Sequence, residues 1–203
     1  MRDNAATIFV VDDDDAVRDS LQILLQTEGY GAEAYGSGRA FLDGYRAGGR
    51  GCLVTDVRMP DMSGLELQQA VIARRLELPV VVMTGQADIP IAVEAMKAGA
   101  IDFLEKPFPD SAILDALRRA LAGDGARALA ARARDAADRA RGLSPRERQV
   151  LEWLVQGLGN KAIARELAIS PRTVEVHRAR VMEKMQADSL SQLVRLALAA
   201  KAA

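Results

Sequence analysis

The chain has 203 residues, of which 49% are hydrophobic and 27% are charged, and it contains a single cysteine, Cys52. This length allows one large domain or two small ones, and the apolar content is sufficient for a packed core. One cysteine excludes an internal disulfide, and no apolar run approaches the roughly 20 residues of a membrane-spanning helix. The N-terminus also lacks a signal-type apolar stretch. We therefore expect a soluble, cytoplasmic protein with no membrane partner.

Charge is divided unevenly along the chain. Residues 1–122 contain 12 Lys or Arg against 19 Asp or Glu, whereas residues 123–203 contain 15 against 9. An acidic first part and a basic second part predict two domains with different partners. The basic second part makes nucleic acid the first partner to consider.

The first 121 residues alternate short β-type runs with amphipathic helical patterns. Strands are predicted at 7–11, 31–35, 51–55, 79–83 and 101–104, and helices near 15–28, 38–47, 64–76, 89–98 and 110–121. The first, third and fourth strand runs are nearly all apolar, as expected for strands covered on both faces. Five βα units in sequence predict a doubly wound parallel sheet. Such sheets place their functional sites beyond the carboxyl ends of the strands.

The rest of the chain is predicted to be helical. Residues 122–142 are rich in Ala, Arg and Asp, which predicts a solvated helical linker whose apolar seam is too thin for a coiled coil. Residues 143–203 predict four helices, and the expected N-caps of the first three are Ser144, Asn160 and Ser170. Glu147, three residues after Ser144, is expected to complete a capping box. The short gap between the second and third of these helices is typical of a helix-turn-helix.

Polar side chains follow several of the predicted strands. Asp12 and Asp13 end the first strand, Asp56 ends the third, and Thr84 and Lys106 follow the fourth and fifth. In a doubly wound sheet these positions fall on one edge. Clustered carboxylates require a cation, and oxygen ligands without nearby His or Cys suit Mg²⁺. A carboxylate can also attack phosphorus to form an aspartyl phosphate, while Mg²⁺ and a lysine neutralise the transferring group.

With these motifs in this order, residues 1–121 resemble the receiver domain of a two-component response regulator, and the last 60 residues resemble a LuxR-type helix-turn-helix domain. The runs TDVRMPDMSG and DIPIAVEAMKAGAIDFLEKPF are most similar to the FixJ branch of the NarL/FixJ family. The resemblance implies a flavodoxin-like α/β receiver at 1–121 with strand order 2-1-3-4-5, a linker at 122–142, and a small all-α DNA-binding domain of four helices at 143–203.

The resemblance also implies roles for individual residues in the first domain. Asp56 is expected to be the phosphoacceptor, with Thr84 bonding a phosphoryl oxygen and Lys106 pairing with the phosphoryl group. Phe103 is the expected switch aromatic, which turns inward when Thr84 moves. The peptide bond from Lys106 to Pro107 is expected to be cis.

A metal site is implied beside the phosphoacceptor. The ion is expected to be Mg²⁺, with Mn²⁺ as an alternative. The expected protein ligands are Asp13, Asp56 and the backbone carbonyl of Arg58, with Asp12 acting through water. The remaining aspartates of the run, at positions 14 and 15, are expected to cap and charge the start of the following helix.

The third helix of the C-terminal domain is the expected DNA-recognition helix. Val174, Val181 and Met185 form an apolar stripe that should pack inward, so the opposite face would enter the major groove. The candidates for base contacts are Arg172, Glu175, Val176, Ala179 and Arg180, and those for phosphate contacts are Lys161, Thr173, Arg178 and Lys184. His177 could bond a phosphate or have a structural role at the helix edge. A protein-binding helical bundle is the alternative interpretation.

The resemblance therefore implies a transcription regulator controlled by phosphorylation, which catalyses only its own phosphorylation and dephosphorylation. Its expected partners are a sensor histidine kinase, double-stranded DNA and RNA polymerase, and it is expected to form a homodimer through residues 89–98, 101–104 and 110–121. Two other classes of protein are the alternatives to this expectation. A Mg²⁺-dependent phosphatase usually carries a second Asp two residues after its nucleophile, where this chain has Arg58. A regulator controlled by a small molecule should contain a ligand pocket in place of five acid-tipped βα units.

Overall fold

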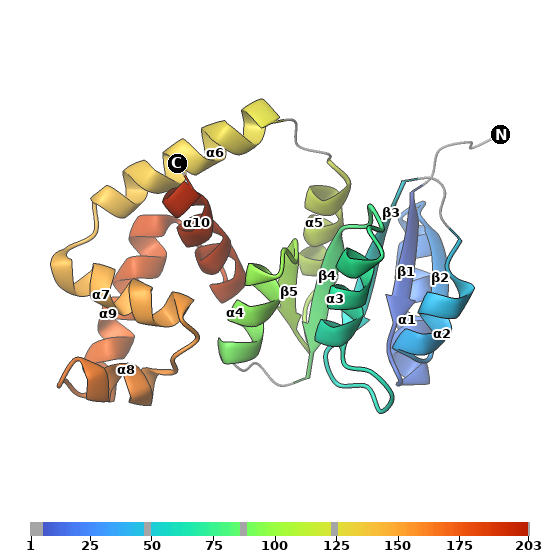
Figure 1. Ribbon diagram of the computed structural model, residues 1–203, viewed down its shortest axis with the longest axis horizontal. Helices are drawn as coiled ribbons and strands as arrows, with labels where there is room; N and C mark the ends of the chain where they lie inside the picture. Colours follow the sequence, from blue (N-terminus) through green and yellow to red (C-terminus); the bar gives the residue numbers. More distant parts are fainter. Residues whose placement is uncertain (1–5, 47–49, 86–88, 123–125, 203) are drawn as a thin grey trace. The chain divides into compact units, whose positions relative to one another are not determined.

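A computed structural model describes residues 6–46, 50–85, 89–122 and 126–202, and Figure 1 shows the course of the chain. The chain divides into two compact units. The first contains the β-sheet with helices α1, α2, α3 and α5, and the second contains α4 and the helices from α6 to α10. None of the helices in the described part of the chain is both long and apolar enough to cross a membrane.

The first unit is built on a five-stranded parallel sheet in the order β2-β1-β3-β4-β5, which confirms the predicted topology. The strands are β1 (Thr7–Val11), β2 (Gly31–Tyr35), β3 (Gly51–Asp56), β4 (Val80–Thr84) and β5 (Asp102–Glu105). Every strand lies within one residue of its predicted position. Strands β1, β3 and β4 are buried along most of their length. Their burial on both faces explains the continuous apolar runs in the sequence.

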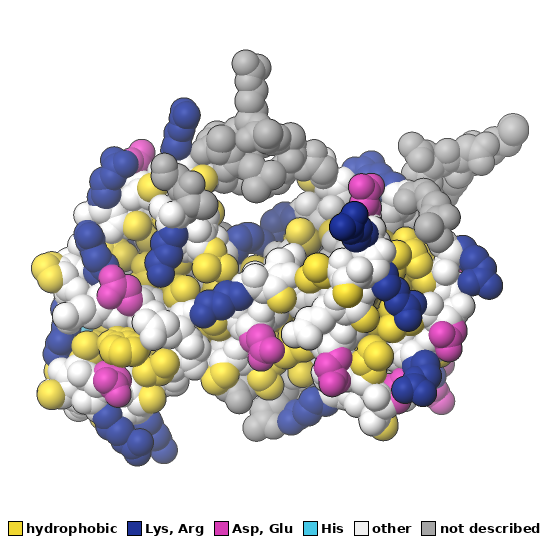
Figure 2. Space-filling view, viewed as in Figure 1, with side chains coloured by type: hydrophobic (Ala, Val, Ile, Leu, Met, Phe, Trp, Pro, Cys, Tyr) yellow, Lys and Arg dark blue, Asp and Glu magenta, His cyan; other side chains and the backbone are white. Residues whose placement is uncertain are grey.

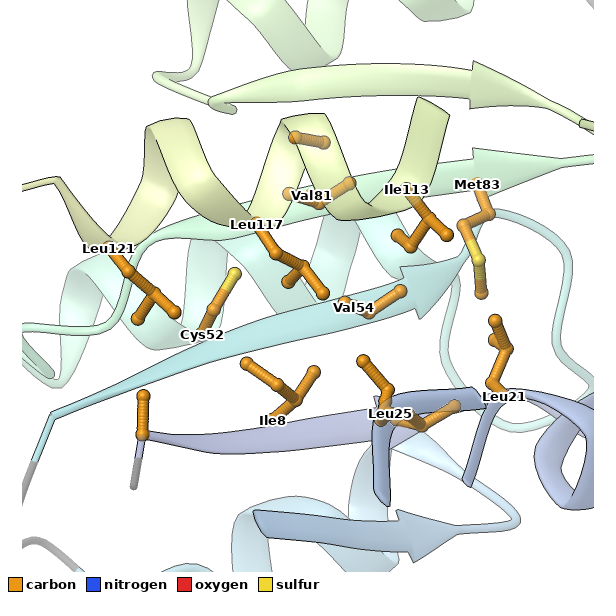
Figure 3. Packing of buried hydrophobic residues seen from close by; sticks show 13 residues of the cluster. Ile8, Leu21, Leu25, Cys52, Val54, Val81, Met83, Ile113, Leu117 and Leu121 are labelled. Atoms are coloured by element: carbon orange, nitrogen blue, oxygen red, sulfur yellow. The ribbon is translucent and has the colours of Figure 1, made fainter. Parts of the chain in front are cut away.

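Helices cover the sheet of the first unit. They are α1 (Asp15–Thr27), α2 (Gly38–Gly44), α3 (Gly64–Ala73) and α5 (Asp110–Leu121). Leu21 and Leu25 of α1 and Ile113 and Leu117 of α5 pack on one side of β1, β3 and β4 (Figure 3). On the other side, the ring of Phe9 makes edge contacts with aromatic rings of α2 and of the residue after it. The two layers fix the strands, and so fix the positions at which the strands end.

The second unit is entirely helical. Its helices are α4 (Ile89–Lys97), α6 (Ala126–Arg141), α7 (Pro145–Val155), α8 (Asn160–Glu166), α9 (Pro171–Met185) and α10 (Leu190–Ala202). Ser144 and Glu147 form the predicted capping box of α7, and Ser170 caps α9 as expected. The prediction for α8 was wrong, because Gly159 and not Asn160 occupies the N-cap position. Glycine is tolerated there, since an N-cap needs extended backbone more than a particular side chain.

Helix α6 occupies most of the predicted linker, of which residues 123–125 lie outside the described part. Its helical state agrees with the prediction, but its last turns are less solvated than expected. Ala136 is completely buried, and Ala140 packs against the same hydrophobic cluster as Leu143. Helix α6 also lies along α10. The small side chains of Ala136 and Ala140 allow a close approach between neighbouring helices, which the mixed charges of this segment did not indicate.

Candidate phosphoacceptor site and DNA-recognition surface

Three of the predicted side chains meet at the carboxyl ends of the strands. Asp12 follows β1, Asp56 is the last residue of β3, and Lys106 follows β5. The Nζ atom of Lys106 donates to Asp12 Oδ2 at 2.5 Å and to Asp56 Oδ1 at 2.6 Å. Both carboxylates are buried, whereas the lysine side chain is 21% exposed. The parallel topology therefore brings together residues that are up to 94 positions apart in the sequence.

The electrostatics of this cluster reflect the competition between burial and pairing. Burial alone would lower the pKa of the Lys106 ammonium, but its hydrogen bonds to Asp12 and Asp56 outweigh this effect and raise the pKa. Burial raises the pKa of the Asp12 carboxyl, and the hydrogen bonds from Lys106 and from the Asp14 N–H offset this only in part. Two buried carboxylates thus share one ammonium, and the cluster carries an excess of negative charge.

The backbone around Asp56 holds its carboxylate in place. The Arg58 N–H donates to Asp56 Oδ2 at 2.5 Å, so both oxygens of this side chain have a donor. The turn that follows approaches closely, because the Gly64 N–H bonds the carbonyl of Val57 at 2.9 Å. A Cβ atom at Gly64 would collide with the Asp56 carbonyl oxygen. The glycine in the MPDMSG run is therefore required by close packing at the site.

The other predicted residues of this site lie nearby in the fold. Thr84 is the last residue of β4 and is buried, and its carbonyl accepts the Lys106 N–H at 2.7 Å. Phe103 in β5 is only 8% exposed, so its ring is already largely buried. Asp13 lies two residues after β1 and is exposed. The bond between Lys106 and Pro107 is cis, as expected.

The chemistry of the donor set fits a hard cation. Asp12, Asp13 and Asp56 offer carboxylate oxygens, and the excess negative charge favours a positive ion. Among the described residues, no three His, Cys, Asp or Glu side chains come close enough to hold a metal ion without help. Mg²⁺ is commonly bound by one or two carboxylates and completes its octahedron with water and substrate oxygens, so this arrangement suits it.

The second region of interest is the helix-turn-helix formed by α8 and α9. Val174, Val181 and Met185 are completely buried and pack in the core cluster of the second unit, which confirms the predicted apolar stripe. The opposite face of α9 is exposed, and it carries Arg172, Glu175, Val176, Ala179 and Arg180. Val176 is one of the few large hydrophobic side chains of the described chain that are exposed, at 48%. An exposed face of this composition can contact base edges in a groove.

Basic side chains accompany this face. Lys161 of α8 and Arg172 and Arg180 of α9 are exposed. Within the described part of the chain, none of these three cations forms an ion pair or side-chain hydrogen bond. Figure 2 shows Lys and Arg side chains gathered over α8. Unpaired cations around a helix-turn-helix are the expected footprint of phosphate binding.

The remaining candidates on α9 are less accessible. Thr173 is engaged in the N-cap of α9, where its hydroxyl lies 2.8 Å from that of Ser170. Arg178 and His177 are partly buried, and His177 Nδ1 is buried without a hydrogen-bond partner among the described residues. Lys184 is partly exposed, but its Nζ donates to Glu147 Oε2 at 2.7 Å and to the Gly142 carbonyl at 3.3 Å.

Sequence reasoning missed two contacts in these regions. Arg18 of α1 donates through Nη1 to the carbonyl of Asp12 at 2.6 Å and also pairs with Asp15, which supports the turn after β1. Glu147 was recognised only as part of a capping box, whereas the structure also pairs it with Lys184. The pairing of Arg18 with Asp15 could have been predicted from the sequence, because the two residues are three positions apart in the same predicted helix. The pairing of Glu147 with Lys184 could not have been predicted in this way, because the two residues are 37 positions apart.

Comparison with known proteins finds a matching family for each of the two parts of the chain. Residues 8–118 match the model of the response regulator receiver domain, and residues 141–197 match that of the luxR family of bacterial regulatory proteins. The transcriptional regulatory protein FixJ of Azorhizobium caulinodans is 56% identical, over 95% of this chain and 92% of that protein. FixJ of Bradyrhizobium diazoefficiens is 52% identical, over 95% of each chain. The crystal structure of full-length FixJ from B. japonicum is 50% identical, with a TM-score of 0.55 over 98% of this chain and 99% of that one.

Proposed function

Since this chain belongs to the FixJ-like two-component response regulators, with a receiver domain and a LuxR-type DNA-binding domain, we propose that phosphorylation of Asp56 controls its binding to DNA. The chain is a transcriptional regulator and not a conventional enzyme. The observation that carries the proposal is the meeting of Asp12, Asp56 and Lys106 at the strand ends, because a buried carboxylate paired with a lysine can accept a phosphoryl group.

In the proposed reaction, a carboxylate oxygen of Asp56 attacks the phosphorus of a phosphohistidine in a sensor kinase. The new P–O bond forms as the P–N bond breaks, and the histidine leaves with the electron pair of that bond. Lys106 already lies 2.6 Å from Asp56 and would pair with the added phosphoryl oxygens. Thr84, at the end of the neighbouring strand, would donate its hydroxyl to the same group. These groups act by placing positive charge and donors where negative charge develops.

Receiver domains typically bind Mg²⁺, and we propose that Asp13, Asp56 and the backbone carbonyl of Arg58 hold it, with Asp12 acting through water. Mn²⁺ is an alternative ion for the same oxygen donors. When bound, the ion would neutralise charge on the phosphoryl oxygens. The excess negative charge around Asp12 and Asp56 supports this assignment, because Lys106 alone does not balance it.

The proposed response to phosphorylation begins with Thr84 and Phe103 and ends in a homodimer. Residues 89–98, 101–104 and 110–121 would pair two receivers, so that two recognition helices act on paired half-sites of a double-stranded operator. Linked half-sites bind more tightly than single ones, because the second contact becomes intramolecular. The protein would work in the cytoplasm with RNA polymerase as a further partner, and activation of transcription is the expected outcome.

The DNA contacts are proposed from the exposure of α9. Arg172, Glu175, Val176, Ala179 and Arg180 would face base edges, with Glu175 accepting from cytosine and Val176 meeting a thymine methyl group. Lys161 and Arg178 would contact phosphates. Thr173 would do so through the hydrogen-bonding capacity that the contact of its hydroxyl with Ser170 leaves free, and His177 through its imidazole ring. Lys184 was predicted to join the phosphate contacts, but in the structure its ammonium is bonded to Glu147 and to the Gly142 carbonyl.

The phosphoacceptor is tested by mapping the modified residue. The full chain would be incubated with a small-molecule phosphodonor and Mg²⁺, and phosphorylation would be followed by intact mass. We expect Asp56→Asn to remain unmodified, whereas the matched control Asp43→Asn, an exposed aspartate in α2, should be modified as the wild-type chain is. Phosphorylation of Asp56→Asn to the wild-type level would show that another residue is the acceptor.

A further inference from the structure

The C-terminal end of α9 is tied to the turn between α6 and α7. Lys184, in the last turn of α9, donates to Glu147 and to the Gly142 carbonyl, as described above. Arg139 of α6 adds a weaker hydrogen bond from Nη1 to the carbonyl of Met185 at 3.4 Å. Cations are favourable at this end of a helix, because its last carbonyls carry partial negative charge. The recognition helix is therefore held at one end by three polar contacts, which involve the last turn of α6, the residue after it and the first turn of α7.

Glu147 is the fixed partner in this arrangement. Its side chain is only 4% exposed, whereas that of Lys184 is 42% exposed. The carboxylate also accepts the Ser144 N–H at 2.8 Å within the capping box of α7. These partners lower the pKa of Glu147 to about 2, with the Lys184 hydrogen bond as the largest cause. A buried carboxylate that is already oriented by the backbone can hold a flexible lysine in one position.

The position of Lys184 along α9 is poorly suited to reading DNA. In a helix-turn-helix the N-terminal residues of the recognition helix contact the base edges. Lys184 lies nine residues after Glu175, which corresponds to about 13 Å along the helix axis. Two of its three donor positions are already directed at protein oxygens. A phosphate contact that drew the ammonium away from Glu147 would leave this buried carboxylate without its cation.

We propose that Lys184 is a positioning residue and not a phosphate contact: held by Glu147, it fixes the recognition helix against the turn between α6 and α7. The proposal rests on the proposed DNA-binding role of α9, and it adds a pair of residues that determines how accurately α9 presents its exposed face. Loosening the pair should lower the preference for the correct sequence, because that preference depends on the orientation of Glu175 and Val176. The sequence-independent attraction to phosphates should remain, because the proposed phosphate contacts of Lys161 and Arg178 are unchanged.

The test measures binding of the full chain, activated with beryllofluoride and Mg²⁺, to a duplex selected from a random-sequence pool by the wild-type protein. The variants are Glu147→Gln, Lys184→Met and the double variant, with Lys161→Met as the matched lysine control and Glu183→Gln as the matched glutamate control. Glutamine keeps the capping box of α7, so Glu147→Gln removes the charge without removing the cap. If Lys184→Met failed to fold, Glu147→Gln and Lys184→Arg would carry the test.

We expect Glu147→Gln and Lys184→Met each to bind the selected duplex about tenfold more weakly than wild type, on the scale of one charge-assisted hydrogen bond. The double variant should be no weaker than either single variant, and Lys184→Arg should regain most of the loss. The dependence of affinity on salt should stay at the wild-type slope in all of these variants. Lys161→Met should instead reduce that slope by about one, as expected for a lost phosphate contact.

Two results would overturn the proposal. In one, Lys184→Met reduces the salt slope as Lys161→Met does while Glu147→Gln binds normally, which would make Lys184 a phosphate contact. In the other, both pair variants bind the selected duplex with wild-type affinity at a temperature at which they are folded, which would make the pair purely structural. Failure of the wild-type chain to select any duplex would count against the proposed DNA-binding function itself, so the two failures are distinguishable.

Discussion

Lys106 and Lys184 are both held by carboxylates, one at the strand ends of the first unit and the other at the end of α9. Lys106 bridges two buried aspartates, so its neighbourhood keeps an excess of negative charge. Lys184 pairs with a single glutamate, Glu147, whose carboxylate also accepts a hydrogen bond from the Ser144 N–H in the cap of α7. One positive charge therefore balances one negative charge in that pair. We infer that charge balance distinguishes the proposed site for a cation and a phosphoryl group from the proposed contact that fixes two helices.

The largest effect should come from removing the lysine of the unbalanced site. We expect Lys106→Met to slow phosphorylation by a small-molecule donor about 100-fold or more, on the scale of a lost donor to developing charge. The measurement is the rate of phosphorylation followed by intact mass. Lys97→Met, which removes an exposed lysine of α4, should leave the rate unchanged. An unaltered rate in Lys106→Met would mean that Lys106 only offsets the charge of Asp12 and Asp56.

The close packing behind Asp56, the proposed phosphoacceptor, predicts an intermediate effect. Gly64→Ala would place a Cβ atom against the Asp56 carbonyl, and we expect the free energy of unfolding to fall by about 1–3 kcal/mol. Urea unfolding followed by circular dichroism measures this change. Gly85→Ala is the control, because a Cβ atom there would meet nothing within 4 Å. Equal stability of the two variants would show that the turn after Asp56 relaxes without cost.

The smallest effect should come from the balanced pair, and it should depend on pH. The pKa of Glu147 is lowered from 4.5 to about 2 in the folded protein, so the carboxylate stabilises the fold above pH 5 and loses this effect as the pH falls towards 2. We expect Glu147→Gln to be less stable by about 1 kcal/mol near neutral pH, since Lys184 is partly exposed. The difference from wild type should shrink steadily below pH 5.

Trp153, the only tryptophan of the chain, provides the signal for that measurement. It lies in α7 and packs against the core of the second unit, so its fluorescence follows unfolding of the helices around the pair. Glu183→Gln, which changes an exposed glutamate of α9, should show no such pH-dependent difference. A stability difference that stayed constant from pH 7 to pH 3 would contradict the role given to the ionised Glu147.

The two regions also differ in how far the sequence predicts them. The strand-end cluster was predictable, because apolar runs locate the strands and parallel topology places every strand end on one edge, with Asp12, Asp56 and Lys106 at those ends. The apolar stripe of α9 was predictable from helical periodicity. The bond between Lys184 and Glu147 was not predictable, because it depends on how α7 and α9 pack. The burial of Ala136 escaped prediction for the same reason, since the mixed charges of the segment indicate a solvated helix and alanine does not show which positions approach another helix.

We propose that the phosphorylation state of Asp56 controls the binding of α9 to DNA. The most direct measurement is the affinity of the wild-type chain and of Asp56→Asn for a duplex selected by the activated wild-type protein, each with and without a small-molecule phosphodonor. We predict that the phosphodonor strengthens binding of the wild-type chain and leaves that of Asp56→Asn unchanged. Equal strengthening of both proteins, or of neither, would contradict the claim.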